Sequence, residues 1–146
     1  MRITALACVL ALSACSAADS SVRPPADQIA CASYTCQVGT DPAILVHDLA
    51  DANFLSLDAR LSWLGDTSCL VVALDGLTAV PLWPGGTTPL RAPDGRRGVT
   101  VPGRGELLDG DTFTTGGSWV PSNGAATPPA GCGGYDGFFA IDSFSS

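Results

Sequence analysis

The chain has 146 residues and no lysine, and its 14 acidic side chains outnumber its seven arginines, giving a formal net charge of −7. Proteins that bind DNA or RNA neutralise backbone phosphates with Lys and Arg, so this balance excludes nucleic acid as a partner. A chain of this length accommodates one domain and a tail.

The first 14 residues are typical of a bacterial export signal. Arg2 supplies a basic start, and the nearly uninterrupted apolar run from Ile3 to Leu12 is too short to cross a bilayer core of about 30 Å. The closing tetrapeptide Leu12-Ser13-Ala14-Cys15 resembles a lipobox. We therefore predict lipidation of Cys15 and attachment to the cell membrane or outer envelope on the extracytoplasmic side. An ordinary signal peptide that happens to contain a cysteine is the alternative.

Two regions follow the signal peptide (1–14). Residues 15–28 are polar, contain a Pro-Pro step and show no periodicity, which is typical of a flexible tether. Residues 29–146 are predicted to form a single small β domain. Its cysteines are Cys31, Cys36, Cys69 and Cys132. In an exported domain they favour two disulfides, for which three pairings exist. A zinc site or a redox centre would favour close CxxC pairs, which the sequence lacks.

From residue 57 onward the sequence indicates strands. Apolar and polar residues alternate over 57–63, which predicts a strand with one buried face. Residues 69–74 are a continuous apolar run, which predicts a strand covered on both faces. Asp75-Gly76 separates this run from the strand expected at 77–83 and is a strong hairpin signal. Pro81 cannot donate to a ladder, so we expect the second arm to lie at an edge or to be bulged there.

Short strands separated by turns rich in Gly and Pro continue to the end of the chain. We expect them at 98–101, 106–108, 112–115, 118–120 and 138–142, with a long loop over 121–134. Nearer the N-terminus, Asp41-Pro42 could begin a short helix near 42–50, an extended segment being the alternative. The fold class is therefore mainly all-β, a small barrel or sandwich with that one short helix.

Several of these segments together resemble a domain of small, uncharacterised actinobacterial lipoproteins. The resemblance rests on Ser68–Val72, Leu82–Thr88, Leu108–Asp111, Gly116-Gly117 and Cys132, and spans roughly Leu57 to Phe144. It implies a compact β-barrel-like domain and a disulfide between Cys69 and Cys132. It carries no known activity and therefore implies no catalytic residue. The pair Cys31–Cys36 lies outside the resemblance and is predicted from its spacing alone.

Few residues suggest catalysis or metal binding. His47 is the single histidine and stands beside Asp48, but no Gly-x-Ser-x-Gly elbow marks a nucleophile. A hydrolase using His47 or a pair of carboxylates is nevertheless the alternative function. Asp109 and Asp111 could begin a calcium loop, yet no Glu follows at EF-hand spacing, so a hairpin turn is the plainer interpretation. We predict no metal and no cofactor.

The three tryptophans suggest where a binding surface could lie. Trp63 shares the alternating face of the 57–63 strand and is expected in the core. Trp83 and Trp119 stand at strand ends beside Pro- and Gly-containing loops, so they are the candidate ligand contacts, with core burial as the alternative. The leading prediction is a non-enzymatic envelope lipoprotein that binds an envelope protein or glycan, or serves as a structural accessory.

Overall fold

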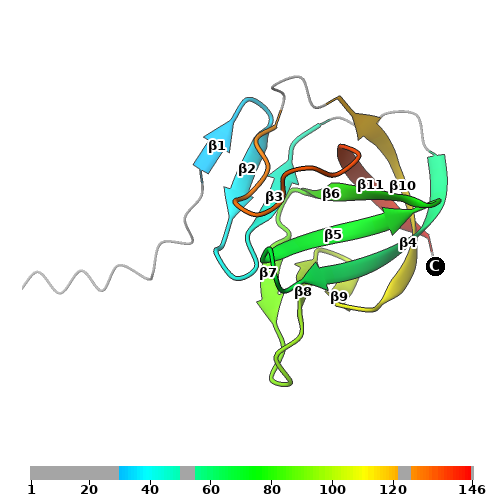
Figure 1. Ribbon diagram of the computed structural model, residues 1–146. Helices are drawn as coiled ribbons and strands as arrows, with labels where there is room; N and C mark the ends of the chain where they lie inside the picture. Colours follow the sequence, from blue (N-terminus) through cyan, green and yellow to red (C-terminus); the bar gives the residue numbers. More distant parts are fainter. Residues whose placement is uncertain (1–29, 50–54, 122–125, 146) are drawn as a thin grey trace, which may run out of the picture.

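The computed structural model describes residues 30–49, 55–121 and 126–145. Within these ranges every regular element is a strand, which confirms the all-β prediction (Figure 1). The strands are β1 (Ala30–Ala32), β2 (Thr35–Val38), β3 (Ile44–His47), β4 (Leu55–Leu64), β5 (Cys69–Leu74), β6 (Leu77–Pro84), β7 (Thr88–Arg91), β8 (Arg97–Val101), β9 (Gly105–Leu108), β10 (Thr112–Val120) and β11 (Phe138–Ser145). The predicted signal peptide, Cys15 and the tether lie outside the described residues.

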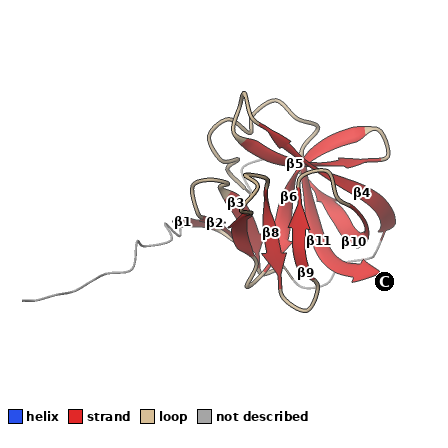
Figure 2. Ribbon diagram, turned by 90° about the horizontal axis from the view of Figure 1, so that it is seen from below, coloured by secondary structure: helices blue, strands red, loops and turns tan. Residues whose placement is uncertain are grey.

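Five strands close into a barrel. Their order is β4-β5-β6-β11-β10, and β10 pairs back with β4. Neighbours are antiparallel except for β6 and β11, which run parallel. A five-stranded barrel with Greek-key connections is the architecture of OB-type folds. Figure 2, turned by 90° from Figure 1, shows the barrel strands surrounding a common interior.

The strands β1, β2 and β3 are attached to the barrel through β6, with which β3 pairs in parallel. On one side of β6, Leu77–Ala79 pairs with β5 and Leu82–Pro84 pairs with β3. The expectation that this arm is an edge strand is wrong, because β6 has neighbours on both sides, although one side is unpaired at Pro81 itself. The amide of Val80 donates to the Gly137 carbonyl, toward β11. The nitrogen of Pro81 therefore points the opposite way, where β5 has ended and β3 has not begun, so no ladder bond is lost.

A second sheet consists of β7, β8 and β9 and lies between β6 and β10 in the sequence. Figure 1 shows its β7–β8 hairpin projecting away from the barrel. One face of this sheet is apolar: Val99, Val101 and Leu107 are buried in the same cluster as the barrel residues Leu61 and Trp83. The sheet therefore shares the barrel core.

Apolar side chains also fill a second cluster on the outer side of the wall. Along β5, Leu70 and Val72 belong to the first cluster, whereas Cys69 and Val71 belong to the second. This confirms that residues 69–72 of the run are covered on both faces, whereas Ala73 is exposed. The segment 126–137, which we call the strap, contributes Ala126 and Cys132 to the outer cluster, with Tyr135 packed against it.

The short helix expected near 42–50 is wrong for the described part of that range, where Ile44–His47 form strand β3. Ile44 and Val46 are β-branched and suit an extended backbone. Strand β3 pairs with β2 on one side and with β6 on the other. These two ladders satisfy its backbone hydrogen-bonding groups and outweigh the local helix-start signal at Asp41-Pro42. Residue 50 lies outside the described residues.

The strands expected at 112–115 and 118–120 are one continuous strand, β10. The Gly-Gly pair between them produces a register shift against β11 instead of a break. A Cβ atom at Gly117 would collide with the Ala140 carbonyl and with the Phe139 ring. Glycine at position 117 therefore allows the two strands to approach closely. In the sequence alone, the same Gly-Gly pair looks like a turn signal.

Candidate functional site

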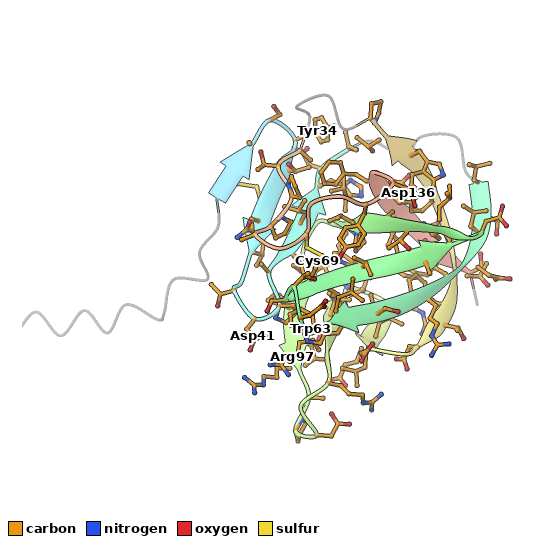
Figure 3. The ribbon with its side chains drawn as sticks, in the orientation of Figure 1. Tyr34, Asp41, Trp63, Cys69, Arg97 and Asp136 are labelled. Atoms are coloured by element: carbon orange, nitrogen blue, oxygen red, sulfur yellow. A yellow bond between two sulfur atoms is a disulfide. The ribbon has the colours of Figure 1, made fainter. Side chains whose placement is uncertain are left out.

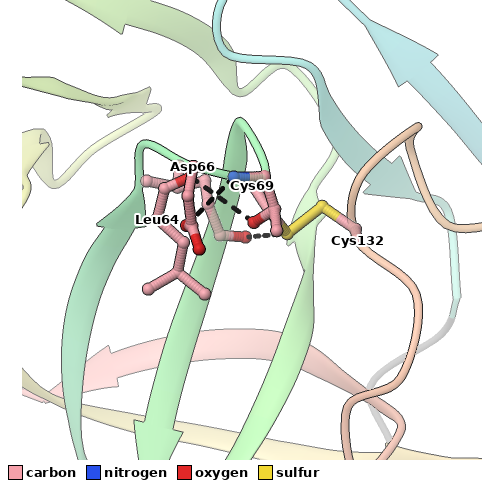
Figure 4. Close-up of a disulfide and its surroundings, with 6 residues drawn as sticks. Leu64, Asp66, Cys69 and Cys132 are labelled. Carbon is pink, nitrogen blue, oxygen red and sulfur yellow. Dashed lines mark hydrogen bonds between the residues drawn. A yellow bond between two sulfur atoms is a disulfide. The ribbon is translucent and has the colours of Figure 1, made fainter.

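The disulfides have the predicted pairing. Cys31 bonds to Cys36 across the β1–β2 hairpin, and Cys69 bonds to Cys132 between the start of β5 and the strap. Cys69 and Cys132 are 0% and 3% exposed, and Figure 4 shows this bond linking the barrel strand to the strap.

Two reciprocal hydrogen bonds hold the end of the strap to the start of β6. The amide of Thr78 donates to the Asp136 carboxylate over 2.8 Å, and the Asp136 amide donates to the Thr78 carbonyl over 2.9 Å. Asp136 is labelled in Figure 3. Together with the disulfide, these bonds fix the strap over the outer face of the barrel.

Trp83 is a core residue, so the expectation that it contacts a ligand is wrong. Its side chain is fully buried, with the Phe113 ring 6.4 Å away, because the second sheet covers this end of the barrel. Trp119 is half-buried and packs edge-on against Phe139, with 5.5 Å between ring centroids. Its contact with a ligand stays a prediction.

His47 is a buried histidine whose two ring nitrogens are both engaged. Its Nδ1 accepts a hydrogen bond from the Leu49 amide over 3.2 Å. In the neutral ring the hydrogen therefore lies on Nε2, which donates to the Ile141 carbonyl over 2.9 Å. The Asp142 carboxylate lies 3.7 Å from the same nitrogen. His47 thereby links β3 to β11, two strands that are not paired with each other.

Asp109 and Asp111 hold a turn against the barrel. A carboxylate oxygen of Asp109 accepts the Trp63 amide over 2.9 Å, and one of Asp111 accepts the Leu108 amide over 2.9 Å. These bonds fit the hairpin-turn interpretation. Within the described ranges, no three His, Cys, Asp or Glu side chains gather in an arrangement suited to a metal ion.

An ionic cluster that sequence reasoning missed joins the N-terminal strands to the second sheet. Asp41 receives Nε and Nη2 of Arg97 over 3.0 and 3.1 Å, and Nη1 of Arg91 over 3.1 Å. The Arg97 guanidinium also lies 5.4 Å from the Trp63 ring centroid (Figure 3). Hydrogen bonding and charge from Arg97 lower the pKa of Asp41 below its ordinary value, and Asp41 raises the pKa of Arg97.

A hollow of about 660 Å³ opens where β6 and β11 end and where β8 turns into β9. It is lined by Pro84, Val101, Pro102, Gly103, Arg104, Asp142, Ser143, Phe144 and Ser145, and we call it the barrel-end hollow. Arg104 offers hydrogen-bond donors and Ser143 offers a hydroxyl, and both residues are exposed. The Asp142 side chain is 2% exposed and lies against His47. Neither Trp83 nor Trp119 lines it. Sequence reasoning missed this site, because its three segments are far apart in the chain.

Known proteins do not identify the chain. Comparisons with protein-family models, with curated proteins and with solved structures give no match. Helices long and apolar enough to cross a membrane do not occur in the described parts of the chain.

Proposed function

We propose that the chain is a lipid-tethered, extracytoplasmic protein whose β domain binds an envelope glycan in the barrel-end hollow and is not an enzyme. The two disulfides support the compartment, since such bonds persist in oxidising environments outside the cytosol. The lipobox-like segment that ends at Cys15 supports the anchor.

The mixed lining of the barrel-end hollow carries the proposal. Pro84, Pro102 and Phe144 offer apolar surfaces, while the exposed residues Arg104 and Ser143 offer hydrogen-bonding groups. A sugar ring presents an apolar face of C–H groups surrounded by hydroxyls, so it needs both kinds of partner. The volume also lies within the range of small-molecule sites, about 300–1,000 Å³.

The location of the hollow supports the same conclusion. OB-type barrels bind oligosaccharides or oligonucleotides on the outer face of their second and third strands. The corresponding strands here are β5 and β6, and the strap packs over their outer face. The barrel end is therefore a more accessible site than that face.

The hydrolase alternative has less support. A catalytic histidine needs a ring nitrogen directed at its nucleophile, whereas both nitrogens of His47 are engaged by backbone groups. Glycoside hydrolysis needs two carboxyl groups across one site. Asp142 is the one carboxylate among the described residues that line the barrel-end hollow.

Replacing the cysteine of the lipobox tests the anchor. Cys15→Ala should release the domain into the soluble extracytoplasmic fraction or leave the precursor uncleaved, because the acyl chains are the proposed attachment. Fractionation followed by alkaline washing measures this. A processed Cys15→Ala protein that remains on the membrane would contradict the proposal.

Amide NMR shifts test the binding site. A chito-oligosaccharide and a muramyl peptide, which adds a carboxylate, should each shift amides of 101–104 and 142–145. Arg104→Ala should weaken binding at least threefold, whereas Arg60→Ala, on the exposed outer side of β4, should leave it unchanged. Unshifted amides throughout the hollow, or equal effects of both variants, would refute glycan binding there.

A further inference from the structure

The charged residues of the barrel-end hollow differ in their access to solvent. Arg104 is exposed, whereas the Asp142 side chain is buried, with its Oδ1 3.7 Å from Nε2 of His47. Among the described residues that line the hollow, Arg104 and Asp142 are the ones that carry a charge. A ligand in the hollow therefore meets the positive charge of Arg104.

The Arg104 guanidinium has no ion-pair partner within the described ranges. The arginines of the neighbouring β7–β8 hairpin do, since each contacts a carboxylate, over 3.1, 2.8 and 3.0 Å for Arg91, Arg96 and Arg97. Glu106 is exposed two residues after Arg104, but it does not line the hollow. In a chain with a net charge of −7, this guanidinium is therefore available to an anionic group of a ligand.

A tight turn holds Arg104 beside the hollow. The turn reads Val101-Pro102-Gly103-Arg104, and the Arg104 amide donates to the Val101 carbonyl over 3.1 Å. Gly103 has a φ of 74°, as the third residue of a type II turn requires, and proline suits the second position. Strands β8 and β9 pair at the base of the turn, where Val101 is opposite Gly105. The backbone is therefore in place before a ligand arrives, which lowers the entropy lost on binding.

A β-bulge in β11 accounts for the exposure of Ser143. Neighbouring residues of β10, Gly116-Gly117, are opposite Ser143 and Ile141, so β11 has one extra residue at this point. Ile141 is fully buried in the core, and strict alternation would direct Ser143 inward as well. The extra residue reverses the alternation, because Ser143 is exposed and Phe144 packs against the core instead. Bulges re-aim side chains in this way and are common next to functional sites.

Building on glycan binding in the barrel-end hollow, we propose that this site selects acidic sugars, whose anionic group pairs with the Arg104 guanidinium. The Ser143 hydroxyl donates to an oxygen of the same ligand, and the sugar ring lies against the apolar part of the lining. A guanidinium carries donors only, and a hydroxyl can donate as well. A carboxylate or phosphate group, which accepts hydrogen bonds, therefore fits these two side chains better than a neutral hydroxyl does.

Three sugars that differ in one group test the selectivity. N-acetylmuramic acid is N-acetylglucosamine with a lactyl carboxylate on O3, and its methyl ester keeps the lactyl group without the charge. Titrations of the mature chain at neutral pH, followed by amide shifts of 103–104 and 142–145, should show about fivefold tighter binding of the acid than of either neutral sugar. Equal affinities for the acid and its methyl ester would overturn acid selection and leave glycan binding intact.

Removing the charge tests the role of Arg104. Arg104→Gln keeps hydrogen-bond donors and should lower the affinity for N-acetylmuramic acid to that of its methyl ester. Arg60→Gln, on the exposed outer side of β4, is the matched control and should leave the preference for the acid unchanged. Both side chains are exposed, so melting temperatures should not change, which checks the fold. A preference for the acid that survives Arg104→Gln, or an equal loss in both variants, would overturn the proposal.

Adding an opposite charge provides a second, independent variant. Ser143→Asp places a carboxylate at an exposed position of the hollow and should weaken binding of N-acetylmuramic acid about threefold or more, relative to its methyl ester. Thr112→Asp, at an exposed position of β10 outside the hollow, should leave the ratio of the two affinities unchanged. An unchanged ratio in Ser143→Asp would overturn the proposed ligand position.

N-acetylglucosamine 6-phosphate distinguishes the two sources of the anionic group. Tighter binding of this sugar than of N-acetylmuramic acid would assign a phosphate-bearing glycan, and the reverse order would assign a carboxylate-bearing one. If none of the four sugars shifts the amides of the hollow, glycan binding itself is refuted, and acid selection with it.

Discussion

Asp41 and Arg97 form a two-point ion pair between the loop that precedes β3 and the first residue of β8, with Oδ1···Nε 3.0 Å apart and Oδ2···Nη2 3.1 Å apart. Arg97 lies directly opposite Arg91 in the β7–β8 ladder, where two like charges would repel. The single carboxylate of Asp41 contacts both guanidiniums. It thereby joins the N-terminal strands to the second sheet and offsets the repulsion within that sheet.

This relationship predicts a dependence of stability on pH. The pKa of Asp41 is lowered in the folded protein, so its contribution is present above the ordinary Asp pKa and is lost as the pH falls through the lowered value. The melting temperature should fall less between pH 5 and pH 2 in Asp41→Asn than in the natural protein. The difference will be small, since the pair is partly exposed. Identical pH profiles would show that the pair contributes nothing.

The two disulfides should contribute unequally to stability. Cys69–Cys132 closes a loop of 63 residues and should contribute about 4 kcal/mol, whereas Cys31–Cys36 closes one of 5 and should contribute about 2 kcal/mol. Urea unfolding of the paired alanine variants measures both values. An equal loss of free energy in the two variants would contradict the assigned roles.

Trp83 is expected to be a stability residue. Trp83→Ala should lower the free energy of unfolding by about 3–5 kcal/mol, because a fully buried indole leaves a large cavity. Trp119→Ala should cost less, since this side chain is half-buried. Chemical denaturation of both variants tests the order, and a larger loss in Trp119→Ala would reverse it.

His47 should stabilise the fold and take no direct part in binding. His47→Ala removes the partner of the buried Ile141 carbonyl and should lower the unfolding free energy by about 1–3 kcal/mol. Glycan binding measured well below the melting temperature should be unchanged. Loss of function with unaltered unfolding would instead support the hydrolase alternative.

The sequence predicts those features of this fold that depend on local pattern. Alternation over 57–63 and the apolar run over 69–74 identify β4 and β5, because the order of apolar and polar residues along a strand reflects which of its faces are buried. The interior position of Pro81 could not be predicted, since it depends on where β5 ends and β3 begins on the same side of β6.

The candidate binding site was predicted less well than the strands, because it too depends on contacts between segments that are far apart in the chain. Trp83 looks like a residue beside a loop, and its burial follows from a sheet formed by later residues. The barrel-end hollow joins Pro84, the 101–104 turn and the end of β11. No short motif contains these segments, so only the folded arrangement brings them together.

The closing strand of the barrel is also the last of its strands along the chain. Strand β11 bridges β6 and β10, so the barrel stays open until residues 138–145 are available. A chain that emerges with its N-terminus first, from a ribosome or through a translocation channel, therefore cannot complete its core on the way. In the proposed export, this strand order would delay closure of the barrel until residues 138–145 have left the channel, so the chain would stay extended while it crosses.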